Sequence, residues 1–381
     1  MERPNRVLAG DSAREPTVRT ARPKIRAMLF APLPPPVGGI TSITAMLHRE
    51  LGATNEVVFL QPVAKTTTWK RVVRPFLSLA RLIRGTLYVP AGGRVVFFCS
   101  SRASFWDKCV WASVVLLLRR TVVMVMVAGD FPEAFAAAPA IARVFAHWLL
   151  RRRGIIVAAQ SASWMAIYRR IFPHTIVTEI GATVEREFFQ DYDRSSPPQS
   201  VVTLLFVGWV IPDKGVFDLL DALELIGTWV DGRARVRIVG PTFGREEFWR
   251  AEIERRGIGG IVALVGAVTN RAEILREYHD ADAFVFPSHY EGFPVAMLEA
   301  TAAGLLCIAS DVGGVADILD GGRTGMVVPP KCPEKLAAAI KRAVSDAALR
   351  ESLGAAAAEH TRSAFSLESC VTSYERVLGL R

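Results

Sequence analysis

The chain has 381 residues, a formal net charge of +9 and an apolar content of 51%. This composition excludes a disordered protein, and the length predicts two domains rather than one. The longest apolar runs, 109–118 and 121–129, are separated by Arg119 and Arg120, and neither is long enough to span a bilayer. No basic N-terminal segment leads into an apolar stretch, so we expect no secretory signal, and residues 1–23 are predicted to form a disordered basic tail.

Strand and helix patterns alternate along the N-terminal half. Strands are predicted near 25–30, 56–60, 94–99, 121–127, 155–159 and 175–179, with helices near 40–52, 73–86, 105–119 and 133–151. Such alternation predicts a mostly parallel sheet with helices on both faces. The polar, proline-bearing stretch 189–200 then predicts a linker between two domains.

The same pattern restarts after the predicted linker. Strands are predicted near 203–207, 235–239, 262–265, 283–287, 306–309 and 326–328, with helices near 215–227, 246–257, 271–279, 294–303 and 334–345. The fold class is therefore α/β, with two doubly wound, Rossmann-like sheets. Ligands of such folds bind at the carboxyl ends of the strands, so we expect a cleft there between the two domains.

The segment 283–304 has a specific order of elements. The apolar run 283–286 predicts a buried strand that stops at Pro287. Pro294 suits the first position of a helix, because its missing N–H costs nothing there, and Gly304 suits the end of that helix. A strand, a tight loop and a helix N-terminus therefore follow one another directly.

This arrangement predicts an anion site with two carboxylates beside it. The backbone N–H groups of Gly292, Phe293 and Val295 would face an anion at the helix N-terminus. Glu291 lies in the loop, and Glu299 lies about two helical turns further along, where it can accept hydrogen bonds from hydroxyl groups. A nucleotide sugar, with its diphosphate and its sugar and ribose hydroxyls, fits such a site.

Three motifs in this order resemble those of glycosyltransferase family 4, the retaining enzymes of the GT-B fold. They are Pro36-Val-Gly38-Gly39-Ile40, then Leu204-Leu-Phe-Val-Gly208-Trp-Val-Ile-Pro-Asp-Lys214-Gly215, then Pro287-Ser288 with Glu291-(seven residues)-Glu299, followed by Gly313-Gly314 and Thr324-Gly325. Each motif lies at a strand-to-helix junction. The resemblance is almost continuous from about 203 to 330 and loose in the N-terminal half.

The resemblance implies roles for individual residues. Lys214 would neutralise the donor diphosphate, Glu291 would hold the donor sugar near its anomeric carbon, and Glu299 would bind the ribose. Gly38 and Gly39 would let the backbone approach a ligand. The full set implied for donor binding is Gly38, Gly39, Gly208, Trp209, Lys214, Gly266, Glu291, Gly292, Phe293, Pro294, Val295 and Glu299, and the set for catalysis is Glu291, Lys214 and Asp130.

Two positions depart from the family pattern. Trp209 stands where the family usually has an arginine, and an indole cannot supply that charge. Either Lys214 and the helix N-terminus suffice, or Arg245 or Arg323 compensates. No histidine lies near 128–131, where many members have one that contacts the donor sugar, so Asp130 is expected either to take part of that role or to act as a helix N-cap.

The resemblance also implies the domain plan. Residues 24–195 would form an acceptor-binding domain, and residues 196–365 a nucleotide-sugar-binding domain. Residues 366–381 would form a helix that crosses back to the N-terminal domain.

Positive charge is concentrated in the N-terminal half, with a net charge of +14 over residues 1–195 and −5 over residues 196–381. One explanation is a compositional preference for arginine. The other is binding to an anionic membrane surface or a lipid-linked phosphate acceptor. The candidate residues are Lys65, Trp69, Lys70, Arg71, Arg74, Arg81, Arg84, Arg151, Arg152 and Arg153. Nucleic acid is not expected, because no binding module accompanies the charge.

A metal site is not expected. The five cysteines, 99, 109, 307, 332 and 370, have no C-x-x-C spacing, and most are predicted to be buried in a reducing cytosol. Asp280 and Asp282 resemble a metal-binding Asp-x-Asp, but they fall between a helix end and a buried strand. His289 is predicted to be a plain loop residue, and the other histidines have no ligand spacing.

The predicted function is retaining transfer of a sugar from a nucleotide-diphosphate sugar, without cofactor or metal, to a polysaccharide or lipid-linked oligosaccharide. The predicted location is the cytoplasm, at the inner face of the cytoplasmic membrane. One alternative is a degenerate nucleotide-sugar-binding or scaffold subunit, and a weaker one is a nucleotide-sugar 2-epimerase. A dinucleotide dehydrogenase is disfavoured, because no G-x-G-x-x-G follows any predicted strand.

Overall fold

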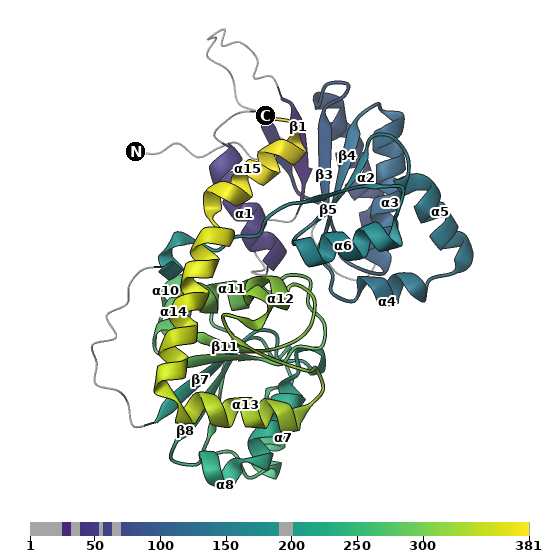
Figure 1. Ribbon diagram of the computed structural model, residues 1–381. Helices are drawn as coiled ribbons and strands as arrows, with labels where there is room; N and C mark the ends of the chain where they lie inside the picture. The colour runs from purple at the N-terminus through teal and green to yellow at the C-terminus, as the bar shows by residue number, and fades with distance from the viewer. Residues whose placement is uncertain (1–24, 32–38, 53–55, 63–69, 190–200, 381) are drawn as a thin grey trace, which may run out of the picture. The chain divides into compact units, whose positions relative to one another are not determined.

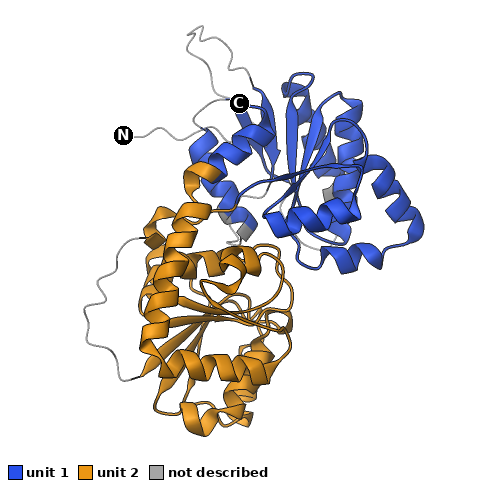
Figure 2. Cartoon of the chain, in the orientation of Figure 1, with its two compact units in different colours: residues 1–181, 370–381 blue, residues 182–369 orange. Residues whose placement is uncertain are grey.

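The computed structural model describes residues 25–31, 39–52, 56–62, 70–189 and 201–380. The chain divides into two compact units, residues 1–181 with 370–381, and residues 182–369 (Figure 2). The division thus lies before residue 182, whereas the sequence places the boundary near 195. Most of the predicted linker, 190–200, lies outside the described residues.

The first unit contains a six-stranded parallel sheet with the order β2-β1-β3-β4-β5-β6 (Figure 1). The strands are β1 (Ala27–Phe30), β2 (Val57–Leu60), β3 (Arg94–Cys99), β4 (Thr121–Met126), β5 (Ile155–Ala159) and β6 (Ile176–Glu179). Most of their residues are buried, as expected for a parallel sheet covered on both faces.

Helices connect these strands. They are α1 (Gly39–Leu51), α2 (Lys70–Tyr88), α3 (Ala103–Leu117), α4 (Phe131–Ala136), α5 (Ala140–Leu150) and α6 (Ala162–Ile171), and α15 (Leu367–Leu378) adds most of its length to this unit. The prediction of one helix over 133–151 is wrong, because Pro139 breaks it. A proline has no N–H for the helix ladder and restricts the residue before it. Helix α4 therefore ends at Ala136, and α5 starts at Ala140, directly after Pro139, whose φ of −53° and ψ of 140° are non-helical.

The C-terminal helix is fixed to the first unit by hydrogen bonds from side chains to backbone carbonyls. The Arg94 guanidinium donates to the carbonyl oxygens of Arg376 and Val377 at 2.7 and 2.8 Å. The Cys370 thiol donates to the Gly181 carbonyl at 3.2 Å. Residues 370–381 therefore belong to the N-terminal compact unit although they end the chain.

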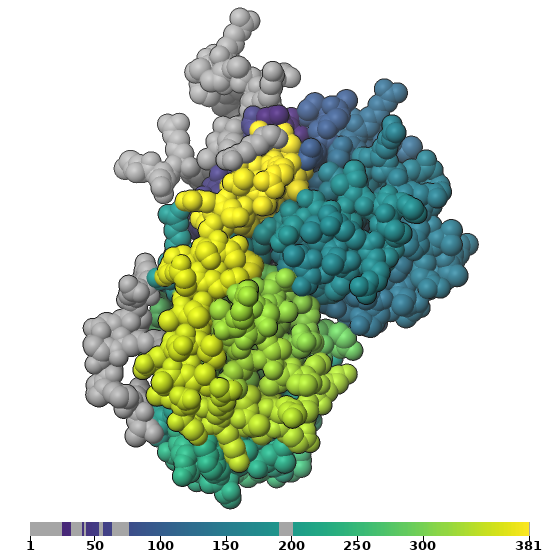
Figure 3. Space-filling view, viewed as in Figure 1, coloured from purple at the N-terminus to yellow at the C-terminus, as the bar shows by residue number. Residues whose placement is uncertain are grey.

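The second unit contains another six-stranded parallel sheet, with the order β12-β11-β10-β7-β8-β9. Its strands are β7 (Val202–Val207), β8 (Ala234–Val239), β9 (Val262–Gly266), β10 (Ala283–Phe286), β11 (Leu306–Ser310) and β12 (Met326–Val328). Its α-helices are α7 (Val216–Leu225), α8 (Gly227–Val230), α9 (Glu246–Arg255), α10 (Arg271–His279), α11 (Val295–Ala302), α12 (Val315–Ile318), α13 (Pro333–Ser345) and α14 (Ala347–Ala364). Figure 3 shows α13 and α14, in the green-yellow part of the colour bar, at the surface of this unit.

Helix α11 ends as the sequence predicts. Gly304 has a φ of +74°, which glycine adopts without a steric penalty. Its N–H donates to the Thr301 carbonyl, and the Leu305 N–H donates to the Ala300 carbonyl. This pair of bonds is the Schellman arrangement, and it satisfies carbonyls that the helix end would otherwise leave open.

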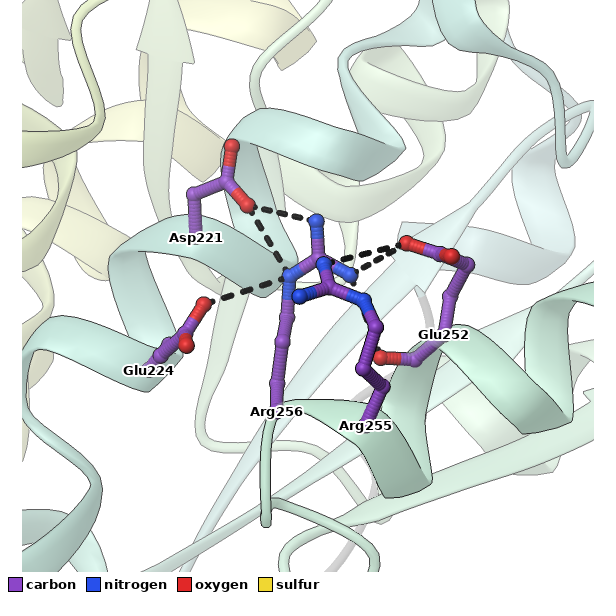
Figure 4. Close-up of polar contacts among 5 residues, drawn as sticks. All are labelled: Asp221, Glu224, Glu252, Arg255 and Arg256. Carbon is purple, nitrogen blue, oxygen red and sulfur yellow. Dashed lines mark hydrogen bonds and ion pairs between the residues drawn. The ribbon is translucent and has the colours of Figure 1, made fainter.

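A buried arginine joins α9 to α7 behind the sheet. Arg256 has a side chain that is only 6% exposed, and its guanidinium contacts Asp221 at 2.7 Å, Glu252 at 2.6 Å and Glu224 at 3.4 Å (Figure 4). Three carboxylates thus pair with the Arg256 guanidinium, whose own side chain has little contact with water.

The prediction of two doubly wound, Rossmann-like domains is confirmed. Each predicted strand is present in one of the two sheets, within one or two residues of its expected bounds. The expected cleft between the domains stays a prediction. Within the described ranges, no helix has the length and apolar character needed to cross a membrane.

Candidate functional site

Lys214 and Glu291 meet in the second unit. The Lys214 Nζ lies 2.5 Å from Glu291 Oε1, with Glu291 8% exposed and the lysine side chain 23% exposed. The ammonium also lies 5.9 Å from the centroid of the Phe286 ring. Lys214 follows β7 and Glu291 follows β10, two neighbouring parallel strands, so both residues lie at the carboxyl edge of the sheet.

A close backbone approach brings these two loops together. Gly215 has a φ of +68°, and a Cβ on it would lie 1.8 Å from the Pro287 carbonyl oxygen. The His289 N–H donates to the Asp213 carbonyl at 2.9 Å. Only glycine fits at position 215, because any side chain would overlap the loop that carries Glu291.

A second contact, between side chains, joins the loop of Glu291 to helix α7. His289 Nε2 lies 2.9 Å from Asp218 Oδ2, and both side chains are largely buried. Asp218 lies in the first turn of α7, where a carboxylate is favoured by the helix dipole. The sequence predicts His289 to be a plain loop residue. In the structure it lies in a loop but also contacts Asp218.

The loop before α11 is buried between two other segments. Gly292, Phe293 and Pro294 are buried, and Phe293 is 6% exposed. The Gly314 N–H donates to the Gly292 carbonyl at 3.1 Å, and a Cβ on Gly313 would lie 1.8 Å from the Glu291 carbonyl oxygen. The glycine pair that follows β11 therefore fixes the loop that precedes α11.

Helix α11 begins at Val295, one residue later than the sequence suggests, and Pro294 is its N-cap. The first N–H groups of an α-helix have no partner within the helix, and the helix dipole favours an anion beside them. Glu291 lies four residues before this helix start, so the acidic side chain and the N-terminus share one loop.

Three glycines line the same edge further along the sheet. Gly208 donates its N–H to the Val239 carbonyl at 3.0 Å, and Gly240 donates its N–H to the Gly266 carbonyl at 2.8 Å. A Cβ on Gly240 would lie 1.7 Å from the Gly208 carbonyl oxygen, so these two backbone segments are in contact. The ends of β7, β8 and β9 are therefore adjacent and bare of side chains at these positions.

Trp209 is exposed at this edge and pairs with another aromatic residue. Its side chain is 52% exposed, and its ring lies edge-on to Phe243 with 5.4 Å between centroids. Phe243 has a φ of +53°, which costs roughly 1 kcal/mol for a residue with a side chain. The arginine expected here is replaced by an aromatic pair.

Arg245 and Arg323, the two candidates to compensate for the missing arginine, each contact another side chain. Arg245 lies over the Phe248 ring at 4.2 Å. Arg323 pairs with Asp320 at 2.5 Å, and the hydrogen bonds to Asp320 raise the pKa of this guanidinium. Their compensation for the missing family arginine stays a prediction.

Glu299 is held by two side chains inside the unit. Its Oε2 accepts a hydrogen bond from the Tyr278 hydroxyl at 2.8 Å, and its Oε1 lies 3.3 Å from Arg271. Burial raises the pKa of the Glu299 carboxyl above its usual value, and the bonds from Tyr278 and Arg271 act in the opposite direction. The side chain is 16% exposed.

Arg271 connects Glu299 to the segment that precedes the predicted linker. It forms ion pairs with Glu185 and with Glu187, the latter at 3.6 Å, and it lies 4.3 Å from the centroid of the Phe188 ring. One guanidinium therefore faces three carboxylates. Sequence reasoning did not find this network, because no local pattern links position 271 to position 299.

The predicted residues of the first unit are placed as follows. Asp130 is the N-cap residue of α4 but makes no capping bond, and it pairs with Arg102 at 3.4 Å. Gly39 is the first residue of α1, and Gly38 lies outside the described residues. Their part in donor binding or catalysis stays a prediction.

The Asp280 and Asp282 pair has a structural role. Asp282 accepts a hydrogen bond from the Thr203 N–H at 2.7 Å, and its own N–H donates to the Thr203 carbonyl at 2.8 Å. Asp280 ends α10. The Asp282 carboxylate therefore fixes the start of β7.

Residues 189–360, slightly less than half of the chain, match the family described as Glycosyl transferases group 1. A similar relative is a glycogen synthase of Mycobacterium tuberculosis, with 31% identity over 182 residues, which covers 48% of this chain and 43% of that protein. The chain thus spans less than half the length of this relative. The matched region contains Lys214, Glu291 and Glu299.

Solved structures resemble the whole fold. The sucrose-phosphate synthase of Thermosynechococcus elongatus has a TM-score of 0.75 and 18% identity, and the match covers 93% of this chain and 98% of that one. Anabaena HepE in complex with UDP has a TM-score of 0.72 and 15% identity, with 93% and 99% covered. At such identities the likeness establishes the fold.

Proposed function

We propose that this chain is a retaining glycosyltransferase that moves a sugar from a nucleotide-diphosphate sugar to an acceptor hydroxyl. The observation that carries the proposal is the Lys214–Glu291 pair at the carboxyl edge of the sheet, beside the N-terminus of α11. The match of residues 189–360 to glycosyl transferases and the UDP in a structural neighbour support a nucleotide-sugar donor.

Lys214 can serve both Glu291 and a diphosphate. An ammonium has three N–H donors, and one is directed at Glu291 Oε1. The other two can contact phosphate oxygens, and the N-terminal amides of α11 can contact them too. Negative charge accumulates on the diphosphate as the sugar leaves, so a fixed cation stabilises the transition state more than the ground state.

The proposed reaction keeps the anomeric configuration. The bond between the anomeric carbon and the diphosphate oxygen breaks, and a bond to the acceptor oxygen forms on the same face. The proton of the acceptor hydroxyl passes to the departing phosphate oxygen. Glu291 holds the sugar hydroxyls beside this carbon, and Glu299 holds the ribose, so neither has to act as a nucleophile.

The proposal includes no metal ion, because Lys214 and the backbone amides supply the positive charge. Dialysis against a chelator tests this part directly. Full turnover after dialysis is expected, and loss of turnover that added Mg²⁺ restores would refute it.

The proposed acceptor is a polysaccharide or a lipid-linked oligosaccharide at the inner face of the cytoplasmic membrane. It is supported by the net charge of +14 over residues 1–195, which suits anionic headgroups and phosphate-linked lipids. Among the basic residues behind this proposal, Arg81 and Arg84 are exposed on α2, while Lys65 and Trp69 lie outside the described residues.

A donor screen tests the proposal. UDP-, GDP- and ADP-sugars are added one by one, and binding raises the unfolding temperature by mass action. The best donor is then incubated with lipid-linked and free oligosaccharides, and the anomeric proton coupling of the product reports the configuration. Inversion would refute the retaining mechanism, and no response to any donor would refute the proposal.

A second candidate is a nucleotide-sugar-binding subunit without catalysis. Trp209 favours it, since the exposed indole occupies the position of a family cation. Donor binding without transfer, hydrolysis or epimerisation would identify this function. Release of an altered sugar without acceptor would instead identify a 2-epimerase.

A further inference from the structure

Helix α5 has an apolar face that no core covers. Ile141, Val144, Phe145 and Trp148 are 82%, 66%, 36% and 41% exposed. Their spacing of i, i+3, i+4 and i+7 places them along one side of the helix. The opposite side, with Ala146, Leu149 and Leu150, is buried in the core of the first unit. A surface helix is normally polar on its outer side, so this exposed apolar face indicates an interaction site.

Neighbouring helices also carry exposed apolar side chains. More than half of the exposed large hydrophobic side chains among the described residues lie on α2, α3 and α5. Helix α3 packs against both other helices, and all three cover the same face of the first sheet. Val110 and Leu117 on α3 are also exposed, to 53% and 82%.

Positive charge borders the exposed face of α5. Arg151, Arg152 and Arg153 follow the helix directly and are exposed. The Arg152 guanidinium lies 4.1 Å from the centroid of the Trp148 ring, which in turn is stacked with Phe145 at 6.1 Å. Between residues 70 and 160 the sequence has fourteen Lys and Arg residues but only three acidic ones. The segment that contains this face is therefore strongly basic.

We propose that the exposed face of α5, together with Arg151, Arg152 and Arg153, binds the surface of an anionic lipid bilayer. Aromatic and aliphatic side chains enter the boundary between headgroups and acyl chains, and arginines pair with lipid phosphates. Because Arg152 stacks on Trp148, a cation lies directly beside an aromatic ring of the kind that favours the membrane interface. Of the membrane-binding candidates from the sequence, this surface includes Arg151, Arg152 and Arg153.

A bilayer suits this face better than a second copy of the chain. A two-fold pairing through α5 would place two cationic borders in one interface and supply no negative charge to either, so like charges would repel. An anionic lipid surface removes this repulsion and covers the apolar side chains at once. The binding does not depend on sugar transfer, so it can be tested without donor or acceptor.

The test is sedimentation of the full chain with vesicles of phosphatidylcholine alone or with added phosphatidylglycerol, at low and high salt. The apolar variant is Ile141→Ser/Val144→Ser/Trp148→Ser, and the charge variant is Arg151→Gln/Arg152→Gln/Arg153→Gln. The matched controls are Leu225→Ser, a residue 59% exposed in the second unit, and Arg233→Gln/Arg250→Gln/Arg255→Gln on exposed helices and turns there. Circular dichroism verifies that each variant folds.

We expect wild type and both controls to bind the anionic vesicles at low salt, to bind them less at high salt, and to bind the neutral vesicles weakly at either salt. The charge variant should lose about a hundredfold in partition coefficient, at a factor of roughly five for each arginine. The apolar variant should lose at least tenfold. Equal partitioning of wild type with anionic and neutral vesicles at low salt would overturn the proposal. So would a dimer in solution that only the apolar variant dissociates, because the face would then be a self-association surface.

Discussion

The Lys214 ammonium and the Glu291 carboxylate lie 2.5 Å apart although 77 positions separate them in the chain. They are joined by two loops that touch at Gly215 and Pro287, so the pair depends on backbone packing rather than on side-chain flexibility. A fixed pair can act on a ligand without first paying the entropy of ordering two long side chains.

Removing either charge should reduce catalysis while the fold remains. Lys214→Ala and Glu291→Gln are each expected to lower kcat by about 100- to 1000-fold, the usual loss when a preorganised charge at the reacting group is removed. Steady-state kinetics with the best donor measures this. Lys331→Ala, a lysine that lies over Tyr290 at 5.8 Å, is the control for removing a nearby positive charge and should retain most activity. Near-normal turnover of both site variants would show that the pair is structural.

The close approach at Gly215 should not tolerate a side chain. Gly215→Ala puts a Cβ within 1.8 Å of the Pro287 carbonyl oxygen, so the loop that carries Glu291 has to move. We expect a loss of about 3 kcal/mol in the free energy of unfolding, measured by urea denaturation, together with loss of activity.

Gly232→Ala is a matched control for this strain. Gly232 has a φ of +69°, nearly that of Gly215, but a Cβ there meets nothing within 4 Å. Its cost should be limited to the left-handed backbone, about 1 kcal/mol. Equal losses in both variants would mean that the contact with Pro287 contributes nothing.

The pKa of Glu299 should make stability depend on pH. Burial raises the pKa of this carboxyl above the usual 4.5, so the folded protein binds its proton more tightly than the unfolded chain does. Stability from this group is therefore fully present below pH 4.5 and is lost as pH rises through the folded pKa. Glu299→Gln should flatten this fall, and urea denaturation between pH 4 and pH 8 measures it. An unchanged pH profile would show that Glu299 titrates normally.

Arg271 opposes the effect of burial on Glu299. Arg271→Gln should raise the pKa of Glu299 further and weaken donor binding at the acidic end of the range, because a protonated carboxyl accepts fewer hydrogen bonds from ribose. Calorimetric titration with the donor at several pH values follows this. Tyr278→Phe removes the other hydrogen bond and should shift the pKa in the same direction.

The sequence predicts the strands of both sheets well, because continuous apolar runs between turn signals are a local property. It does not predict α14 (Ala347–Ala364), whose alanine-rich sequence has little amphipathic periodicity, and it joins α4 to α5 across Pro139. In the site, the Glu291 loop and Lys214 follow from motifs. The Arg271–Glu299 contact spans 28 positions and arises from the packing of α10 against α11, which no spacing encodes.

The guanidinium of Arg256 should be a stability determinant without a role in the site. Arg256→Leu is expected to cost about 2 kcal/mol of unfolding free energy, less than a fully buried pair, because Asp221 and Glu224 are 42% and 48% exposed. Arg250→Leu breaks a solvent-exposed pair with Glu246 on the same helix and should change stability by less than about 0.5 kcal/mol. Thermal or urea denaturation compares the two variants. Equal losses of unfolding free energy would show that the Arg256 cluster stabilises the fold no more than the exposed pair does.

Trp209 distinguishes the two proposed functions. Trp209→Arg places a guanidinium where the family resemblance implies one, and if Lys214 alone limits catalysis, the added charge should raise kcat/KM by about tenfold. Isothermal titration with the nucleoside diphosphate should show tighter binding in parallel. If binding is lost instead, the exposed indole and its Phe243 partner must contact the donor themselves. If binding tightens and turnover stays at zero, the chain binds nucleotide sugars without transferring them, and the catalytic proposal is wrong.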